Sequence, residues 1–396
     1  MICRRGFLII ATLIFAAGAA VALDVEITGE IKTGLFIENR EAKNTATGKT
    51  ETFSHTRMYN NDGDSGNEEG RIRLGLNFTG ETFGLRSRFY QESFKRGTSI
   101  VDSAVHRAWV DYAYAYAHAF DEQLKISAGL LGESPWGTGG PELFRELEYT
   151  NEGAAVMGIR TEWKPSFVPG LNVGFVLNKA DDSTPLDAKE QFGDLFLESI
   201  LGIAWEHEYF AFRFAYRLDR GIDSPAAIVN GERFVYRVEE RILKNFLPGF
   251  QIWANGYGHG INAGKGSGRG TPGYVQNWLY ILYDNVNFET GMNTGYRDAF
   301  VHNAQQLEFR PFFYWKFFDN FLSVGAMAGM EIGYNNGKSF DDVFYNFWFV
   351  EPRVKVNVNS NLYAALVYRF TSGAYGTSYI KEQTTHWINL RLVYSF

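Results

Sequence analysis

The feature that most constrains the fold of this chain is a two-residue alternation of apolar and polar side chains, which recurs from residue 25 to the carboxyl terminus. The clearest example is the segment from Phe210 to Leu218, in which Phe, Phe, Phe, Tyr and Leu alternate with Ala, Arg, Ala and Arg. Successive side chains of a β-strand point to opposite faces, so this segment has one apolar face and one polar face. The chain is therefore predicted to be all-β.

Hydropathy restricts how such a sheet can be covered. The mean hydropathy is −0.22, and after the first 22 residues no stretch approaches the ~18 apolar residues that a membrane-spanning helix needs. A helical membrane protein is therefore excluded. A barrel with an apolar outside and a polar interior can have so low an average. Alternation and hydropathy together predict a transmembrane, antiparallel, up-and-down β-barrel.

The alternation can be followed through eighteen segments, with sixteen strands as the alternative because the tenth to twelfth segments are the least regular. Pro311 and Pro352 weaken two of the segments, since proline cannot donate to a ladder and a closed barrel has no edge strand. The predicted strands are residues 25–37, 71–79, 83–94, 105–117, 124–132, 154–164, 171–178, 195–206, 209–218, 232–242, 250–257, 274–283, 286–296, 305–317, 321–334, 346–357, 362–370 and 386–396.

The connections between these strands alternate between short and long. The short ones include 80–82, 206–208, 284–285 and 358–361, and the long ones are 38–70, 133–153, 179–194, 219–231, 258–273, 335–345 and 371–385. Transmembrane barrels have short periplasmic turns and long external loops, and an even strand number returns both termini to the periplasm. Aromatic residues near the short turns, among them Tyr116, Trp163 and Trp315, are expected to form an interfacial girdle.

The polar faces of the predicted strands carry many charges. Eight-stranded barrels are filled by side chains, whereas barrels of 16 to 18 strands leave an aqueous channel. Charges in a dry interior would be prohibitively costly, so the lumen is expected to be wet. The residues expected to face it are Glu26, Glu30, Lys32, Arg71, Arg73, Arg86, Arg88, Glu92, Arg107, Asp111, Arg160, Glu162, Arg213, Arg217, Arg237, Glu239, Arg241, Glu289, Arg310, Arg353, Lys355, Arg369 and Arg391.

The amino terminus has the pattern of an export signal. Arg4 and Arg5 precede an apolar run from Phe7 to Ala17, and Ala20-Val21-Ala22 fits the small-x-small cleavage rule. We expect residues 1–22 to be a cleaved signal peptide and residues 23–396 to form a single barrel domain. The only cysteine, Cys3, lies in the signal, so the mature chain is expected to have no disulfide and no lipid anchor.

The carboxyl terminus ends in one more alternating strand, from Ile388 to Phe396. Leu390, Leu392, Tyr394 and the terminal Phe396 share its apolar face. The segment resembles the closing strand of bacterial outer-membrane β-barrels, in which the final aromatic residue is an assembly signal. The resemblance implies a location in the outer membrane of a diderm bacterium, contact with its lipid, and assembly by periplasmic chaperones and the barrel-assembly machinery.

The architecture of the whole mature chain resembles that of porins. The segment from Gly132 to Glu148, after the fifth strand, is similar in position and character to the porin constriction loop, although its Gly-Gly-Pro-Glu-Leu-Phe order departs from the porin pattern. The resemblance implies that this loop folds into the pore, and an external loop with solvated carboxylates is the alternative. The acidic residues of the implied constriction are Glu142, Glu146 and Glu148, and they would face a basic wall of Arg71, Arg73, Arg86, Arg88 and Arg107.

These features predict a water-filled channel for passive diffusion of small hydrophilic solutes, with a preference for anionic or zwitterionic solutes that bear carboxylates. A surface-exposed binding or adhesion barrel acting through the long loop 38–70 is the alternative. No enzymatic activity, cofactor or metal is expected, because no constellation of nucleophile, base or ligands is evident. The chain has 38 basic and 45 acidic residues, and loss of Arg4 and Arg5 leaves a net charge of −9, which argues against nucleic-acid binding. The solute, the ion selectivity, and the choice between a monomer and a homotrimer are left open.

Overall fold

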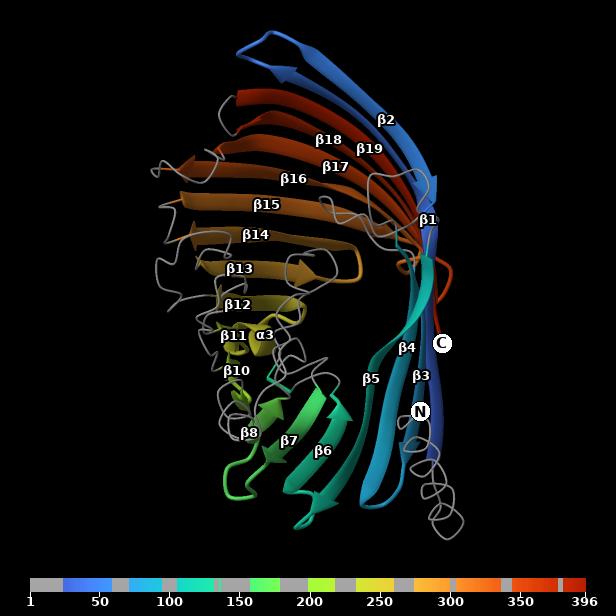
Figure 1. The fold of residues 1–396 in the computed structure, drawn as a ribbon, viewed down its shortest axis with the longest axis vertical. Helices are drawn as coiled ribbons and strands as arrows, with labels where there is room; N and C mark the ends of the chain where they lie inside the picture. The colour runs from blue at the N-terminus through green and yellow to red at the C-terminus, as the bar shows by residue number, and fades with distance from the viewer. Residues whose placement is uncertain are drawn as a thin grey trace, which may run out of the picture.

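In a computed structural model the chain forms one continuous antiparallel β-sheet (Figure 1). The structure describes residues 24–58, 71–94, 105–131, 135–136, 157–178, 199–217, 233–259, 274–299, 304–335, 344–376 and 380–396. The predicted signal peptide lies outside these residues. Among them, no helix is long and apolar enough to span a membrane.

The described residues contain nineteen strands and one short helix. They are β1 (Asp24–Asn44), β2 (Thr50–Met58), β3 (Arg71–Thr79), β4 (Phe83–Phe94), β5 (Val105–Ala119), β6 (Leu124–Leu130), β7 (Met157–Trp163), β8 (Leu171–Asn178), β9 (Ile200–Glu206), β10 (Phe210–Arg217), β11 (Arg233–Glu240), α3 (Ile242–Phe246), β12 (Phe250–His259), β13 (Tyr274–Asp284), β14 (Phe288–Ala299), β15 (Ala304–Phe317), β16 (Leu322–Asn335), β17 (Phe344–Asn357), β18 (Leu362–Gly376) and β19 (Ile380–Ser395).

The sheet is closed. From β3 onward each strand pairs with the next along the chain, and β1 pairs with β19 to complete the ring. Residues 24–32 of β1 pair with β3, and residues 35–43 of the same strand pair with β2. Because β2 and β3 follow one another along the same edge of β1, they occupy a single position in the barrel. The barrel therefore has eighteen strand positions, and the prediction of eighteen strands is confirmed.

Two predicted long loops are partly strand, and those loop boundaries are wrong. Within the predicted loop 38–70, β1 continues to Asn44 and turns into β2; within the predicted loop 371–385, β18 continues to Gly376 and β19 begins at Ile380. In Figure 1 the hairpin of β1 and β2 projects beyond the other strands. Residues such as Glu41, Lys43 and Thr52 are polar because this part of the sheet extends into water. It consequently lacks the apolar face by which the other strands were recognised.

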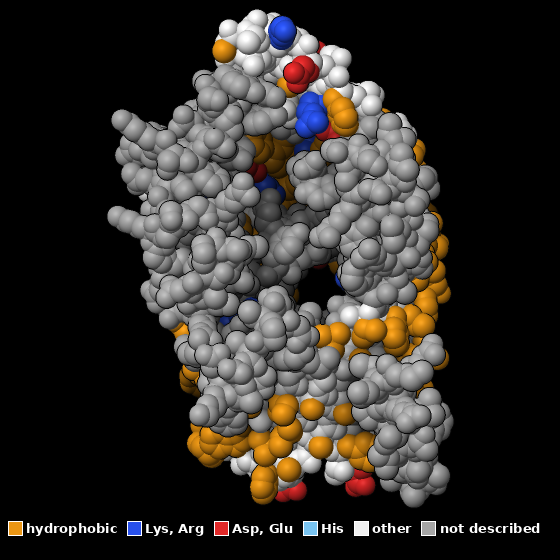
Figure 2. Space-filling view, in the orientation of Figure 1, with side chains coloured by type: hydrophobic (Ala, Val, Ile, Leu, Met, Phe, Trp, Pro, Cys, Tyr) orange, Lys and Arg blue, Asp and Glu red, His pale blue; other side chains and the backbone are white. Residues whose placement is uncertain are grey.

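The outer surface of the barrel is apolar. In β19, exposed Ile388, Leu390 and Leu392 alternate with buried Asn389 and Arg391. Strands around the ring repeat this pattern, so large apolar side chains are exposed on the outside, as Figure 2 shows for one face of the molecule. An apolar outer band on a closed barrel is the surface that outer-membrane barrels present to lipid.

The two prolines that weakened the strand prediction are accommodated inside β15 and β17. Pro311 is paired with β14, but the ladder to β16 is interrupted at Arg310 and Pro311. Pro352 is paired with β16, and the ladder to β18 is interrupted at Glu351 and Pro352. The register is the same on both sides of each interruption. Each proline, which lacks a backbone N–H, therefore interrupts the strand pairing over two residues without opening the barrel.

Eight connections, of three to nine residues, lie at one end of the barrel, which we call the turn end: β3–β4, β5–β6, β7–β8, β9–β10, β11–β12, β13–β14, β15–β16 and β17–β18. Most connections at the other end, the loop end, are longer, but residues 45–49, 300–303 and 377–379 form short connections there. Seven of the eight connections at the turn end present an exposed large apolar side chain: Phe120, Phe167, Tyr209, Phe246, Val286, Phe318 and Val358. Such residues suit the boundary between hydrocarbon and water. The turn end thus has the character of a membrane interface.

The seam between the first and last strands is closed by the terminal residue. Gly29 and Phe396 exchange backbone hydrogen bonds, with N···O distances of 2.8 and 2.9 Å. The aromatic ring of Phe396 lies so close over Gly29 that a β-carbon at position 29 would clash with it. Gly29 therefore provides the space in which the terminal aromatic ring lies.

We predict that Gly29→Leu lowers the unfolding free energy of the barrel by about 1 to 3 kcal/mol, the usual cost of overpacking. In a Phe396→Ala background the same substitution should cost much less, because the obstructing ring is gone. Urea unfolding in detergent micelles, followed by tryptophan fluorescence, measures both costs. Equal costs in the two backgrounds would show that the ring does not lie over Gly29.

Candidate functional site

A column of tyrosines follows the inner face of β5. Tyr112, Tyr114 and Tyr116 succeed one another with ring centroids 5.9 and 6.5 Å apart, and His118 continues the column 5.4 Å from Tyr116. Tyr114 and Tyr116 are buried, whereas the intervening Ala115 is exposed on the outside. The aromatic side chains of this strand therefore face the lumen.

This orientation corrects the expectation that Tyr116 belongs to the outer girdle. The pairing of β4 with β5 shifts between Arg88 and Phe89, which face Tyr112 and Val110 respectively. One residue of β5 is thus bulged, and the bulge exchanges the faces of all residues that follow. Trp163 and Trp315, the other girdle residues considered, are exposed on the outer surface.

Basic side chains flank the tyrosine column from both sides. From β4, the Arg88 guanidinium lies 4.8 Å from the Tyr112 ring centroid and that of Arg86 lies 5.9 Å from Tyr116. From the other side, the Lys125 ammonium lies 4.8 Å from the Tyr116 centroid, and the Arg160 guanidinium lies 5.7 Å from Tyr114. These distances are within the range of cation–π attraction. We call this set of seven residues the cation–tyrosine wall: Arg86, Arg88, Tyr112, Tyr114, Tyr116, Lys125 and Arg160.

A buried carboxylate completes the wall on its far side. Glu162 follows Arg160 on the inner face of β7, and its carboxylate lies 2.9 Å from Nε of Arg160. The side-chain amide of Asn172 on β8 donates to the same carboxylate at 3.4 Å. Arg160 is therefore held by an acid on one side and an aromatic ring on the other, as a buried charge requires.

One described part of the segment after β6 lies inside the barrel. Trp136 is fully buried and packs in a cluster with Tyr114, Tyr116 and Val176 of the inner wall. A β-carbon at Gly174 or Gly202 would clash with the indole, so these two glycines of β8 and β9 form the surface on which it lies. The chain thus crosses the inner wall at Trp136, near the cation–tyrosine wall.

The inner wall formed by β12 to β17 is more apolar than the cation–tyrosine wall. The rings of Trp253 and Tyr280 stack with their centroids 5.0 Å apart and their planes at 9°. They belong to a cluster of seven buried residues on β12, β13, β15, β16 and β17, which also contains Trp278, Phe312, Tyr314, Met327 and Phe349. Charged groups are interspersed in pairs: Arg310 with Glu308 and Glu331, and Arg369 with Glu351. Each of these two arginines therefore has at least one acidic partner on this side of the barrel.

The structure describes only part of the constriction predicted from the sequence. It places Arg73, Arg86 and Arg88 on the inner faces of β3 and β4, since the alternate residues Ile72, Leu74 and Phe89 are exposed outside. The backbones of Arg71 and Arg107 lie in β3 and β5, but their side chains are outside the described part. The three loop carboxylates, Glu142, Glu146 and Glu148, also lie outside the described residues.

Lys125, the tyrosine column and Trp136 were not anticipated as parts of the site. Lys125 was detectable, because it alternates with Ser127 on the polar face of a predicted strand. The tyrosines were hidden by the bulge. Within the described residues, no group of three or more His, Cys, Asp or Glu side chains could hold a metal ion.

No protein-family model matches the sequence, and no curated protein matches it. Among solved structures, the chain is similar to the outer-membrane protein OmpT of Vibrio cholerae, with 11% identity over 95% of this chain and 98% of that chain and a TM-score of 0.48. It is also similar to the outer-membrane channel DcaP of Acinetobacter baumannii, with 10% identity over 95% and 98% and a TM-score of 0.46. A mutant porin of Rh. blastica has 13% identity over 94% and 100% and a TM-score of 0.43. The barrel assignment itself rests on the strand pairing of this chain.

We predict that Trp136→Ala destabilises the barrel by about 3 kcal/mol, because it empties a fully buried indole site. It should also raise the single-channel conductance, since the segment would no longer be held against β8 and β9. Trp163→Ala, which removes an exposed indole from the outer surface, is the matched control and should leave conductance unchanged. An unchanged conductance in Trp136→Ala would contradict a role of this segment in narrowing the lumen.

Proposed function

We propose that this protein is an outer-membrane porin: a water-filled channel for passive diffusion of small hydrophilic solutes, with a preference for those that carry a carboxylate. The observation that carries the proposal is the cation–tyrosine wall on the inside of a closed barrel with eighteen strand positions. Four basic side chains gather there, and Glu162 forms an ion pair with one of them, Arg160. Figure 2 shows a hollow in the molecule with charged side chains within it.

Barrel size and charge support a wet lumen. A barrel of this strand number is too wide to be filled by wall side chains alone. Solvated charges on its inner face are stable only if water reaches them. Excess positive charge along one wall would raise the local concentration of anions and speed their diffusion through the lumen.

The aromatic support of the arginines suits carboxylate recognition. A guanidinium that lies over a tyrosine ring keeps its N–H groups at its edge, where they can donate to a planar carboxylate in pairs. Arg88 over Tyr112 has the shorter of the two arginine distances on β4. We expect these arginines to orient a passing carboxylate and to release it readily, because each contact remains hydrated.

The constriction is proposed to include the third long connection. Trp136 provides an inner-wall anchor for that connection, and Glu142, Glu146 and Glu148 follow it within twelve residues. Carboxylates facing the basic wall would create a transverse field that orients dipolar solutes. Zwitterions such as amino acids would align in this field with both charges matched.

The proposed topology places the turn end in the periplasm and the loop end outside the cell. It rests on the signal-like residues 1–22 and on the alternation of connection lengths. Leu390, Leu392, Tyr394 and Phe396, which the structure aligns on the outer face of the last strand, are proposed as the assembly signal read by the barrel-assembly machinery. The position of Phe396 at the closing seam agrees with such a role.

The channel is tested by reversal potentials of single channels in a planar bilayer under a KCl gradient. Wild-type protein should conduct and prefer anions, and Arg86→Gln combined with Arg88→Gln should shift the reversal potential toward cation selectivity by roughly 10 mV or more, as expected for loss of two fixed charges in a low-dielectric pore.

Arg40→Gln is the matched control, because Arg40 lies on the projecting β1–β2 hairpin over Phe53. It should leave the reversal potential unchanged. Absence of conductance in the wild type would overturn the channel. A normal conductance with an unshifted potential in the double variant would overturn the role of the wall.

The topology is tested separately by cysteine labelling of intact cells. Thr47→Cys lies at the tip of the β1–β2 hairpin and Glu81→Cys at the β3–β4 turn, and both side chains are exposed. A membrane-impermeant maleimide should label Thr47→Cys in intact cells and Glu81→Cys only after the outer membrane is permeabilised. The reverse pattern would mean that the barrel is inserted with the opposite orientation.

The projecting hairpin favours one alternative function, a surface barrel that binds a partner outside the cell. β2 pairs with β1 and leaves its other edge without a paired strand in the described part of the chain. Such an edge can accept a strand from a partner. A binding barrel would be stable but non-conducting, so the bilayer recording also separates these two functions.

A further inference from the structure

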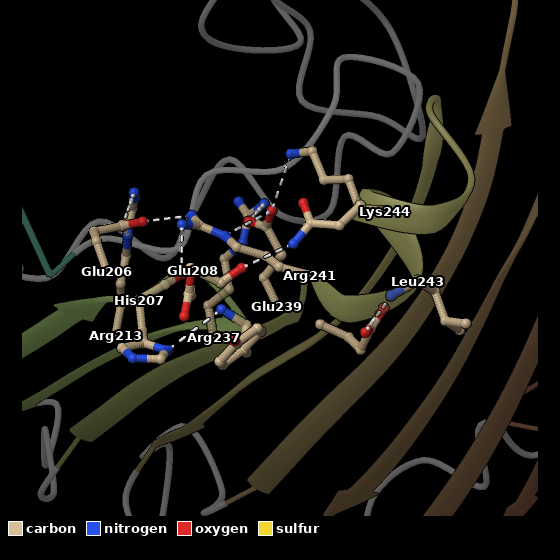
Figure 3. A network of polar contacts seen from close by, with 12 residues as sticks. Glu206, His207, Glu208, Arg213, Arg237, Glu239, Arg241, Leu243 and Lys244 are labelled. Carbon is tan, nitrogen blue, oxygen red and sulfur yellow. Dashed lines mark hydrogen bonds and ion pairs between the residues drawn. The ribbon is translucent and has the colours of Figure 1, made fainter.

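A second group of charged side chains lies at the turn end of the lumen (Figure 3). It forms where the β9–β10 turn meets the connection from β11 to α3. Its acids are Glu206 at the end of β9 and Glu239 on β11, and its bases are Arg213, Arg237, Arg241 and Lys244. We call these six residues the turn-end network.

Each acid is shared by several bases. Glu206 accepts hydrogen bonds from Arg213, at 2.9 Å, and from Arg241. Glu239 has three cations around it: Arg237 at 3.4 Å, and Arg241 and Lys244 both at 3.5 Å. These three distances exceed the usual length of a charge-assisted hydrogen bond. Glu239 therefore forms only long ion pairs with these three cations.

The network has four cations and two carboxylates, a surplus of two positive charges. Two further acids lie nearby and form hydrogen bonds with groups outside the network. Glu208 accepts a hydrogen bond from the Tyr209 hydroxyl, and this bond raises the pKa of that phenol. Glu240 accepts a hydrogen bond from the backbone N–H of Leu243, in the first turn of α3, at 2.7 Å.

The strand register shows that this surplus is built into the wall. Arg213 on β10 lies directly opposite Arg237 on β11. Like charges directly opposite one another destabilise a sheet. The pairing of Arg213 with Arg237 is therefore unfavourable for the fold alone, and a bound anion would offset it.

The bases of the network have different roles. Arg241 is a structural clamp, because its backbone N–H donates to the Tyr209 carbonyl at 3.0 Å and its guanidinium donates to the His207 carbonyl at 3.1 Å. Arg213 and Lys244 are the most accessible, with side chains 36% and 44% exposed. Accessible cations beside a loosely held carboxylate can exchange it for an external anion.

We propose that the turn-end network is a binding station for small anions that carry a carboxylate or phosphate group, formed by Arg213, Arg237 and Lys244. Glu206 and Glu239 serve as the protein's own counterions when the station is empty of solute. The station is formed where the β9–β10 turn meets the connection from β11 to α3, at the turn end of the barrel. The station thus lies at the mouth of the channel, at the end that the proposed topology places in the periplasm.

This inference rests on the proposed channel, and block of the KCl current by inorganic phosphate or succinate tests it. Phosphate added on the turn side should block with weak voltage dependence, because the site lies near that mouth, and phosphate added on the loop side should block with stronger voltage dependence. Lys244→Gln and Arg213→Gln should each weaken the block about three- to tenfold, the range expected for loss of one charge-assisted contact. Glu239→Gln should strengthen it, since the competing carboxylate is removed.

Lys164→Gln is the matched control, because Lys164 is exposed at the same end of the barrel in the β7–β8 turn. It should not alter the block. Equal effects of Lys164→Gln and Lys244→Gln, or a weaker block in Glu239→Gln, would overturn the station. Equal block of the KCl current by succinate and phosphate would show that the site accepts both carboxylate and phosphate groups. Unequal block would show which of these two groups the site prefers.

A non-conducting wild type would overturn the channel rather than the station. The station would then be tested by the broadening of the phosphate ³¹P resonance on adding the detergent-solubilised protein. Broadening that is reduced in Arg213→Gln and Lys244→Gln, but not in Lys164→Gln, would support it. Identical broadening in all four proteins would overturn it.

Discussion

The pairing of β1 with β19 is the interaction on which the rest of the structure depends. Hydrocarbon offers no partner for a free N–H or C=O group, so a sheet can lie in a membrane only if its first and last strands close on each other. Here fifteen residue pairs join the two strands, from Glu30 with Ser395 to Asn44 with Lys381. The glycine at position 29 allows the last aromatic residue to complete this seam.

Closure separates two environments along every strand. The outward residues are apolar because they meet lipid, and the inward residues can be charged because they are shielded from lipid and can pair with opposite charges, as Arg160 does with Glu162. Aromatic rings on the inside support the basic side chains, as Tyr112 does for Arg88 and Tyr114 for Arg160. The fold thereby gives a charged inner surface beside clusters of buried aromatic side chains, and that surface is what the proposed function uses.

Much of this arrangement could be predicted from the sequence, because the alternation of side chains directly reports the two environments. The observed bounds of β3, β4 and β8 coincide with those predicted. The orientation of Tyr116 could not be predicted, since a single bulged residue reverses the faces and leaves no mark in a strand of alternating Ala and Tyr. The β1–β2 hairpin was missed because it has no apolar face, and Trp136 because its contacts are with distant glycines.

The central claim is that the closed barrel encloses a water-filled lumen through which solutes pass. Swelling of liposomes that contain the purified protein, in isotonic solutions of uncharged sugars of increasing size and of glutamate and arginine, tests it most directly. The account predicts swelling rates that fall steeply with solute size, and faster swelling with glutamate than with arginine. Liposomes that fail to swell with any of these solutes, although the barrel is folded and heat-modifiable on gels, would contradict it.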